Sequence, residues 1–187
     1  MMTYLYTTRA KFDKNNDVGI LAWPKYLEWS RLAHLIELVS LDTGLNEVLV
    51  EPDRNSGEYW NEIVMDDCRE TGFFRTLDYI LRKTIDKTRF NLLAVVIEPE
   101  SDCSLIRLDD YDFLGYDLLD PYCDTSALTN CGGFDETFLP GDLNEVGLID
   151  DYEKAYTIKK GLRENNPMEE HADTSVIAIW RHRVIGW

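Results

Sequence analysis

The chain has 187 residues, of which 44% are hydrophobic and 29% charged, and its formal net charge is −16. This apolar content is enough for a packed core and excludes wholesale disorder, and the length suits one compact domain. The negative charge excludes nucleic acids and anionic membrane surfaces as partners, and the sequence has no apolar run of about 18 residues that could span a bilayer.

The N-terminal half of the sequence predicts two strands and two helices. Residues 3–10 are rich in β-branched and aromatic side chains, which favours a strand. Residues 23–40 show apolar positions at three- and four-residue steps after a proline, which predicts a helix. Residues 45–52 form a second candidate strand, the polar stretch 53–62 a loop, and residues 72–86 a second amphipathic helix.

The C-terminal half adds three strands and a third helix. The continuous apolar run 91–99 ends at a proline and predicts a buried central strand, and residues 110–120 predict another strand or an edge. Residues 150–165 predict a helix capped by Asp150, and residues 174–187 a last strand with apolar side chains on both faces. Together these elements predict one α+β domain over residues 1–187, with a mixed β-sheet of about five strands and about three helices.

We expect the core to centre on residues 91–99, paired with neighbours that include the C-terminal strand. We expect five apolar side chains of the two strands to be buried: Leu93, Val95, Ile97, Val176 and Trp180.

The negative charge is concentrated in one segment. Residues 98–153 hold 16 Asp or Glu and one basic residue, Arg107, so this acidic segment nets −15 of the total of −16. It is long for a connection inside a compact domain, which is typical of a functional segment. Such a field would attract a basic partner and speed its association, although acids spread over several faces would only solvate the surface.

Aromatic residues are interleaved with the acids, as at protein-binding hot spots, unless their rings point inward. The predicted partner-binding residues are Asp109, Asp110, Asp112, Tyr116, Asp117, Asp120, Tyr122, Asp124, Phe134, Asp135 and Glu136. The favoured hypothesis is a non-enzymatic acidic binding protein, most concretely an inhibitor or immunity-type protein that covers a basic site on a partner protein such as a toxin or nuclease.

A cysteine-dependent hydrolase is the alternative hypothesis. Cys131 precedes two glycines that could expose backbone N–H groups to an oxyanion, and His171 and Asp173 could serve as base and orienting carboxylate. Against this, acidic surroundings raise the pKa of a thiol and so disfavour the reactive thiolate, and the glycines also suit a helix C-cap. The sequence therefore favours a protein without enzymatic activity.

Metal and cofactor motifs are absent from the sequence. The four cysteines form no CxxC pair, and the sequence contains no EF-hand loop, phosphate-binding loop or dinucleotide fingerprint. We therefore expect neither a metal nor a cofactor. The N-terminal residues do not read as a secretory leader, and the expected location is the cytoplasm, with reduced thiols.

Overall fold

A computed structural model provides the structure of the chain. The residues that it describes are 2–11, 27–28, 30–45, 48, 50, 52–66, 69–84, 88–121, 124–129 and 137–183.

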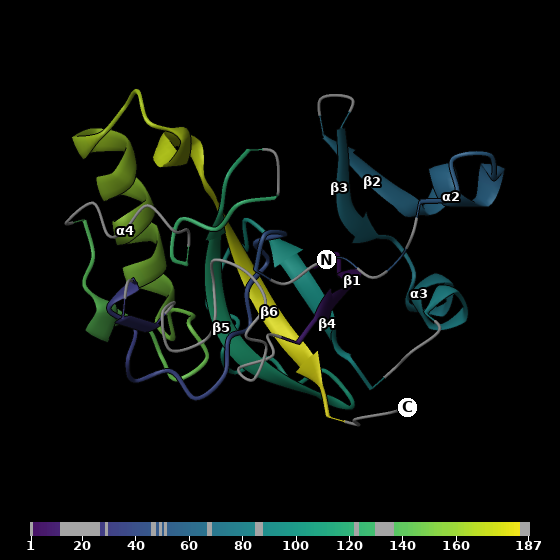
Figure 1. Cartoon of the computed structure of the whole chain (residues 1–187), viewed down its shortest axis with the longest axis horizontal. Helices are drawn as coiled ribbons and strands as arrows, with labels where there is room; N and C mark the ends of the chain where they lie inside the picture. The colour runs from purple at the N-terminus through teal and green to yellow at the C-terminus, as the bar shows by residue number, and fades with distance from the viewer. Residues whose placement is uncertain are drawn as a thin grey trace.

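A six-stranded sheet forms the centre of the molecule (Figure 1). Its strands lie in the order β2-β3-β1-β4-β6-β5, and every pairing is antiparallel. The strands are β1 (Leu5–Ala10), β2 (Ile63–Asp66), β3 (Arg69–Phe74), β4 (Phe90–Ile97), β5 (Tyr111–Leu119) and β6 (Ser175–His182). The α+β prediction is confirmed, with two corrections: the sheet has six strands instead of about five, and within the described residues it is antiparallel instead of mixed.

The predicted core strand is central, as expected. β4 pairs with β1 on one side and with β6 on the other, where Val95 lies opposite Ile179. Four of the five predicted core residues are fully buried: Leu93, Val95, Val176 and Trp180. Ile97 is only half-buried, because it lies at the end of the strand.

The α-helices whose bounds lie within the described residues are α2 (Gly57–Glu62), α3 (Leu77–Lys83) and α4 (Tyr152–Asn165). Figure 1 shows α4 beside β5, whereas α2 and α3 lie at the opposite end of the sheet, near β2 and β3. The cap of α4 is Asp151 and not the predicted Asp150, because the Asp151 carboxylate accepts the Lys154 backbone N–H at 2.7 Å. Short 3-10 turns form at Pro140–Asp142 and Glu170–Asp173.

Predictions for the N-terminal half need correction. Of the predicted helix over residues 23–40, the described residues 27, 28 and 30 are helical, whereas residues 31–40 are irregular. There, Ile36 and Val39 donate their backbone N–H groups to the distant Glu145 and Val146 carbonyls. The predicted helix over residues 72–86 begins only at Leu77, and the start of that range belongs to β3. The predicted loop over residues 53–62 contains α2.

Half of the predicted strand over residues 45–52, namely 46, 47, 49 and 51, lies outside the described residues. Among the other four residues, Val48 forms only an isolated antiparallel bridge to Arg9 of β1.

Both faces of the sheet are covered, as the apolar C-terminal strand indicates. On one face, Trp180 and its alternate neighbours in β6 join a hydrophobic cluster that includes Ile158 and Leu162 of α4. On the other face, Ile177 and Ile179 join a cluster with residues from segments 39–41 and 146–148. The acidic segment is therefore partly core material, because residues 143–149 pack against the sheet.

Among the described residues, no helix has the length and apolar character needed to cross a membrane.

Candidate functional site

Strand β5 divides the predicted acidic surface into two parts. Asp109, Asp110 and Asp112 are exposed near its N-terminal end, whereas Asp117 and Asp120 are fully buried at its C-terminal end. The eight steps from Tyr111 to Leu119 span roughly 26 Å at about 3.3 Å per residue. The predicted residues therefore do not form one continuous surface.

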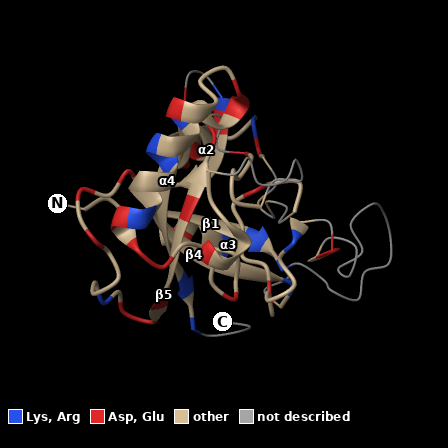
Figure 2. Ribbon diagram, turned by 90° about the vertical axis from the view of Figure 1, so that its left-hand side faces the viewer, with Lys and Arg blue, Asp and Glu red and all other residues tan. Residues whose placement is uncertain are grey.

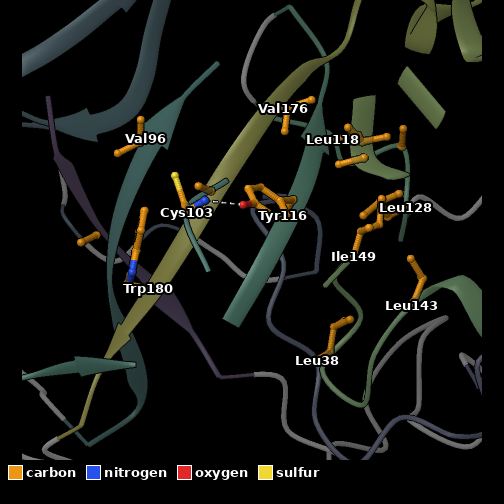
Figure 3. Close-up of a cluster of buried hydrophobic side chains, with 14 of the residues drawn as sticks. Leu38, Val96, Cys103, Tyr116, Leu118, Leu128, Leu143, Ile149, Val176 and Trp180 are labelled. Atoms are coloured by element: carbon orange, nitrogen blue, oxygen red, sulfur yellow. Dashed lines mark hydrogen bonds between the residues drawn. The ribbon is translucent and has the colours of Figure 1, made fainter. Parts of the chain in front are cut away.

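Three predicted partner-binding residues are corrected, because Tyr116, Asp117 and Asp120 have no exposed surface. Tyr116 instead supports a neighbouring loop: its hydroxyl donates to Asp102 Oδ1 at 2.8 Å and accepts the Cys103 backbone N–H at 2.7 Å. Figure 3 shows the Tyr116 ring pointing toward Cys103 among apolar side chains. Burial raises the pKa of the Tyr116 hydroxyl well above its usual value, so it remains a donor at any ordinary pH.

Asp117 joins two segments that are distant in sequence. Its carboxylate accepts backbone N–H groups from Leu41 at 3.0 Å and Leu118 at 2.8 Å, and it also accepts the Ser126 hydroxyl. Burial raises the pKa of this carboxyl group, and the nearby Asp42 adds to that shift. Asp117 is therefore a structural group that fixes the β5 end against residues 40–42 and 126.

Asp120 is less completely satisfied. Its Oδ1 accepts the backbone N–H groups of Asp124 at 3.2 Å and Thr125 at 3.4 Å, but its buried Oδ2 has no hydrogen-bond partner. Burial, and then repulsion from Asp124, raise the pKa of the Asp120 carboxyl group. Asp124 itself is exposed. Of the acids predicted at this end of β5, Asp124 alone among the described residues remains available to a partner.

Several predicted residues lie outside the described part of the chain: Tyr122, Cys131, Phe134, Asp135 and Glu136. The pairing of Cys131 with His171 therefore stays a prediction. His171 is half-buried in the turn Glu170–Asp173, and the exposed Asp173 carboxylate lies 3.8 Å from the Arg163 guanidinium.

The exposed acids of the N-terminal part belong to the connection between β4 and β5. We call residues 98–110 the acidic loop; it contains five acids and one basic residue, Arg107. Glu98 pairs with Lys159 at 2.6 Å. The other four acids of this loop are exposed and form no ion pair within the described residues: Glu100, Asp102, Asp109 and Asp110.

Hydrogen bonds hold the acidic loop on the sheet. Tyr152 and Tyr156 of α4 donate their hydroxyls to the Pro99 carbonyl at 3.1 and 2.9 Å. Asp102 accepts the backbone N–H and the hydroxyl of Ser104 at 2.9 and 2.8 Å, which closes a tight turn. These contacts hold the start of the acidic loop and the Asp102 carboxylate in place before any partner binds.

Charge elsewhere is more evenly mixed. Figure 2 shows Asp and Glu in red and Lys and Arg in blue together on α4. A cavity of about 670 Å³ beside this helix is lined by Lys159, Lys160 and Arg163, but each of these cations has a carboxylate within 4 Å. The positive charge of this cavity is therefore already compensated.

A second cavity, of about 310 Å³, lies against β3 and is lined by Tyr59, Glu70, Phe74 and Asp124 among others. Glu70 is occupied by a bidentate contact with Arg54 and by the Tyr59 hydroxyl. The described residues form no cluster of three or more His, Cys, Asp or Glu side chains that could hold a metal ion. The described residues that line the two cavities include no cysteine and no histidine.

Sequence reasoning missed one surface residue of the acidic loop. Leu105 is 88% exposed, whereas Cys103 on the same turn is fully buried. The apolar positions 103, 105, 106 and 108 follow no helical or strand period, so the sequence alone does not tell which side chain points outward.

Comparison of the chain with protein-family models, with curated proteins and with solved structures finds no match.

Proposed function

We propose that this chain is a non-enzymatic binding protein whose acidic loop covers a basic site on a partner protein, as an inhibitor or immunity-type protein would. The observation that supports this most is the set of four exposed carboxylates at Glu100, Asp102, Asp109 and Asp110, which have no ion pair within the described residues. Like charges held together repel, and a cationic partner relieves that repulsion.

The geometry suits a site of ordinary protein–protein size. Asp102 is bonded to Tyr116, and Asp110 precedes Tyr111, so the two acids are separated along β5 by about five residues, or roughly 17 Å. A specific interface covers about 800 Å² on each partner, which is large enough to include both acids. Exposed charges of this kind act mainly on the rate of association.

Affinity capture from an extract of the native host, at low and physiological salt, tests the proposal. We expect a basic protein that binds more weakly as salt rises, because exposed charges are screened over about 8–10 Å. In the variant Glu100→Lys with Asp109→Lys, association with that protein should slow by about tenfold or more at low salt, with a smaller change in dissociation. Asp110 is left unchanged because its φ of 64° disfavours lysine.

A matched control variant has the same total charge as the loop variant. Glu169→Lys with Glu170→Lys also adds four units of positive charge, at exposed positions outside the acidic segment. If both double variants slow association equally, net charge and not the acidic loop is responsible. Capture of no salt-sensitive basic protein, or equal binding by wild type and the loop variant, contradicts the proposed function. Arg107→Glu gives the opposite test, since one more acid in the loop should speed association.

A further inference from the structure

Leu105 lies exposed at the outermost part of a turn whose other apolar side chains face inward. Its exposure is 88%, whereas Cys103 is fully buried and Ile106 and Leu108 are half-buried against the core. The residues on both sides of Leu105 thus pack against the core, whereas the Leu105 side chain lies in solvent.

The exposure of Leu105 does not arise from an unsupported coil. The Ile106 backbone N–H donates to the Cys103 carbonyl at 3.0 Å, which closes the turn around Leu105. The Trp180 ring N–H lies 3.4 Å from the Ile106 carbonyl, and the Cys103 backbone N–H is bonded to Tyr116. A backbone that is held in this way loses little conformational freedom on binding, which favours a role of this turn in holding an anchor.

The surroundings of Leu105 indicate the chemistry of its partner. Residues 100–110 carry four exposed carboxylates and one arginine, so the loop nets −3 around the leucine. Protein–protein interfaces combine an apolar centre with a polar rim. A complementary site would be an apolar pocket with lysine and arginine at its edge.

We propose that Leu105 is the anchor of the acidic loop and inserts into an apolar pocket, ringed by Lys and Arg, on the basic partner; this inference rests on the proposed function. A second copy of this chain is a poorer occupant, because two acidic loops would face each other with like charge. An anionic membrane surface is repelled for the same reason.

The test uses the partner captured by the wild-type chain and measures association and dissociation separately. Leu105→Ala should speed dissociation by about tenfold or more, because truncation removes the contact that forms after encounter. Association and its salt dependence should change little, since no charge is altered. Leu105→Met should retain slow dissociation, because methionine fills a similar apolar volume.

Leu139→Ala is the matched control, since Leu139 is also an exposed leucine of the acidic segment, 66% exposed, but lies outside the acidic loop. A photo-crosslinking amino acid at position 105 then identifies the contacted residues of the partner. We expect apolar residues with Lys or Arg beside them. Both substitutions act on exposed side chains, and unchanged unfolding curves confirm that the fold is intact.

The possible results separate the two proposals. Unchanged dissociation in Leu105→Ala, together with slowed association in Glu100→Lys with Asp109→Lys, overturns the anchor and leaves the proposed function standing. Absence of any salt-sensitive basic partner overturns both. Light scattering that shows self-association lost in Leu105→Ala identifies a second copy as the occupant, and Leu105-dependent sedimentation with phosphatidylcholine–phosphatidylglycerol vesicles identifies a membrane; either result also overturns the inference.

Discussion

The two ends of β5 carry the same type of residue in opposite environments. Before Gly115, Asp112 is exposed and the next two residues are half-buried, whereas every residue from Gly115 to Asp120 is buried. Asp112 therefore lies at the surface, while Asp117 and Asp120 are internal. The comparison shows that acidic residues of one strand can supply either a surface or a structural junction, depending on what covers the strand.

The difference arises because β5 is an edge strand and other segments of the chain cover only part of its free edge. β5 has β6 on one side, and on its other side Tyr116 exchanges backbone hydrogen bonds with Ile149, at 2.8 and 3.0 Å. Further along, the Leu118 carbonyl accepts the Ala127 backbone N–H at 2.8 Å. The chain itself thus covers the C-terminal half of the edge, which prevents pairing with another strand there and buries the carboxylates.

The largest expected effect lies at the boundary between the two halves. Gly115 has a φ of 136°, and a Cβ atom there would lie 2.8 Å from the Ile149 carbonyl oxygen. Gly115→Ala should therefore lower the free energy of unfolding by about 2–4 kcal/mol, measured by chemical denaturation, because strain and overlap with backbone combine. Gly141→Ala is the control, since no atom lies within 4 Å of its Cβ position. Equal values for the two variants would mean that Gly115 does not hold the cover in place.

The next effect tests the buried end. Both oxygens of Asp117 accept backbone N–H groups, from Leu41 and Leu118. In Asp117→Asn, the side-chain NH₂ group must face one of these two backbone N–H groups, whether or not the carboxyl group it replaces was protonated. That contact leaves a buried donor without an acceptor. We expect a loss of about 1–3 kcal/mol in the free energy of unfolding by chemical denaturation. A neutral result would show that this carboxyl group is not the junction between residues 41 and 118.

The sequence predicts the sheet better than its connections. The apolar run of β4 and the two apolar faces of β6 specify buried strands, because any register of these residues must hide them. Residues 31–40 show a helical apolar period, yet Leu35 and Val39 are buried in an irregular segment. The backbone N–H groups of Ile36 and Val39 donate to the carbonyls of Glu145 and Val146, and such long-range pairing leaves no local pattern in the sequence.

The site was less predictable for a related reason. Counting charges identifies the acidic segment, but Asp109 and Asp117 look alike in sequence, and only the position of residues 40–42 and 126 decides which one is buried. Leu105 shows the reverse case. Its exposure follows from the turn that Asp102 and Ser104 close, and from Trp180, which is 75 residues away in sequence.

A smaller effect is expected at Asp120, and it depends on pH. Burial and the nearby Asp124 raise the pKa of Asp120 in the folded state above the value of about 3.9 found in unfolded chains. The folded state then binds the proton more tightly, so this stabilisation is complete below about pH 3.9 and is lost as pH rises through the folded-state pKa. An uncharged amide at position 120 does not titrate, so the variant does not lose this stabilisation as pH rises.

Asp120→Asn should therefore keep or raise the free energy of unfolding at neutral pH. Its oxygen can still accept the Asp124 and Thr125 N–H groups, and its NH₂ group replaces an oxygen that has no partner. Denaturation between pH 4 and 8 should show a flatter pH dependence than wild type, although the buried Asp42 and Asp117 keep part of the slope. Destabilisation as large as that of Asp117→Asn would show that the two buried acids have equivalent roles.

The smallest effect is expected at the exposed end. Asp112 pairs with Arg183 at 2.8 Å, but the two side chains are 63% and 55% exposed, and exposed pairs contribute about 0.2–1 kcal/mol. Arg183 also donates to the Tyr111 carbonyl at 2.9 Å, so it keeps a partner when the carboxylate is removed. Asp112→Ala should therefore change the free energy of unfolding by about 0.5 kcal/mol or less, and by still less at high salt. A double-mutant cycle with Arg183→Ala measures the pair directly. A coupling above about 1.5 kcal/mol would mean that the exposed end of β5 stabilises the fold as much as the buried end does, and its acids would then be poor candidates for a surface reserved for a partner.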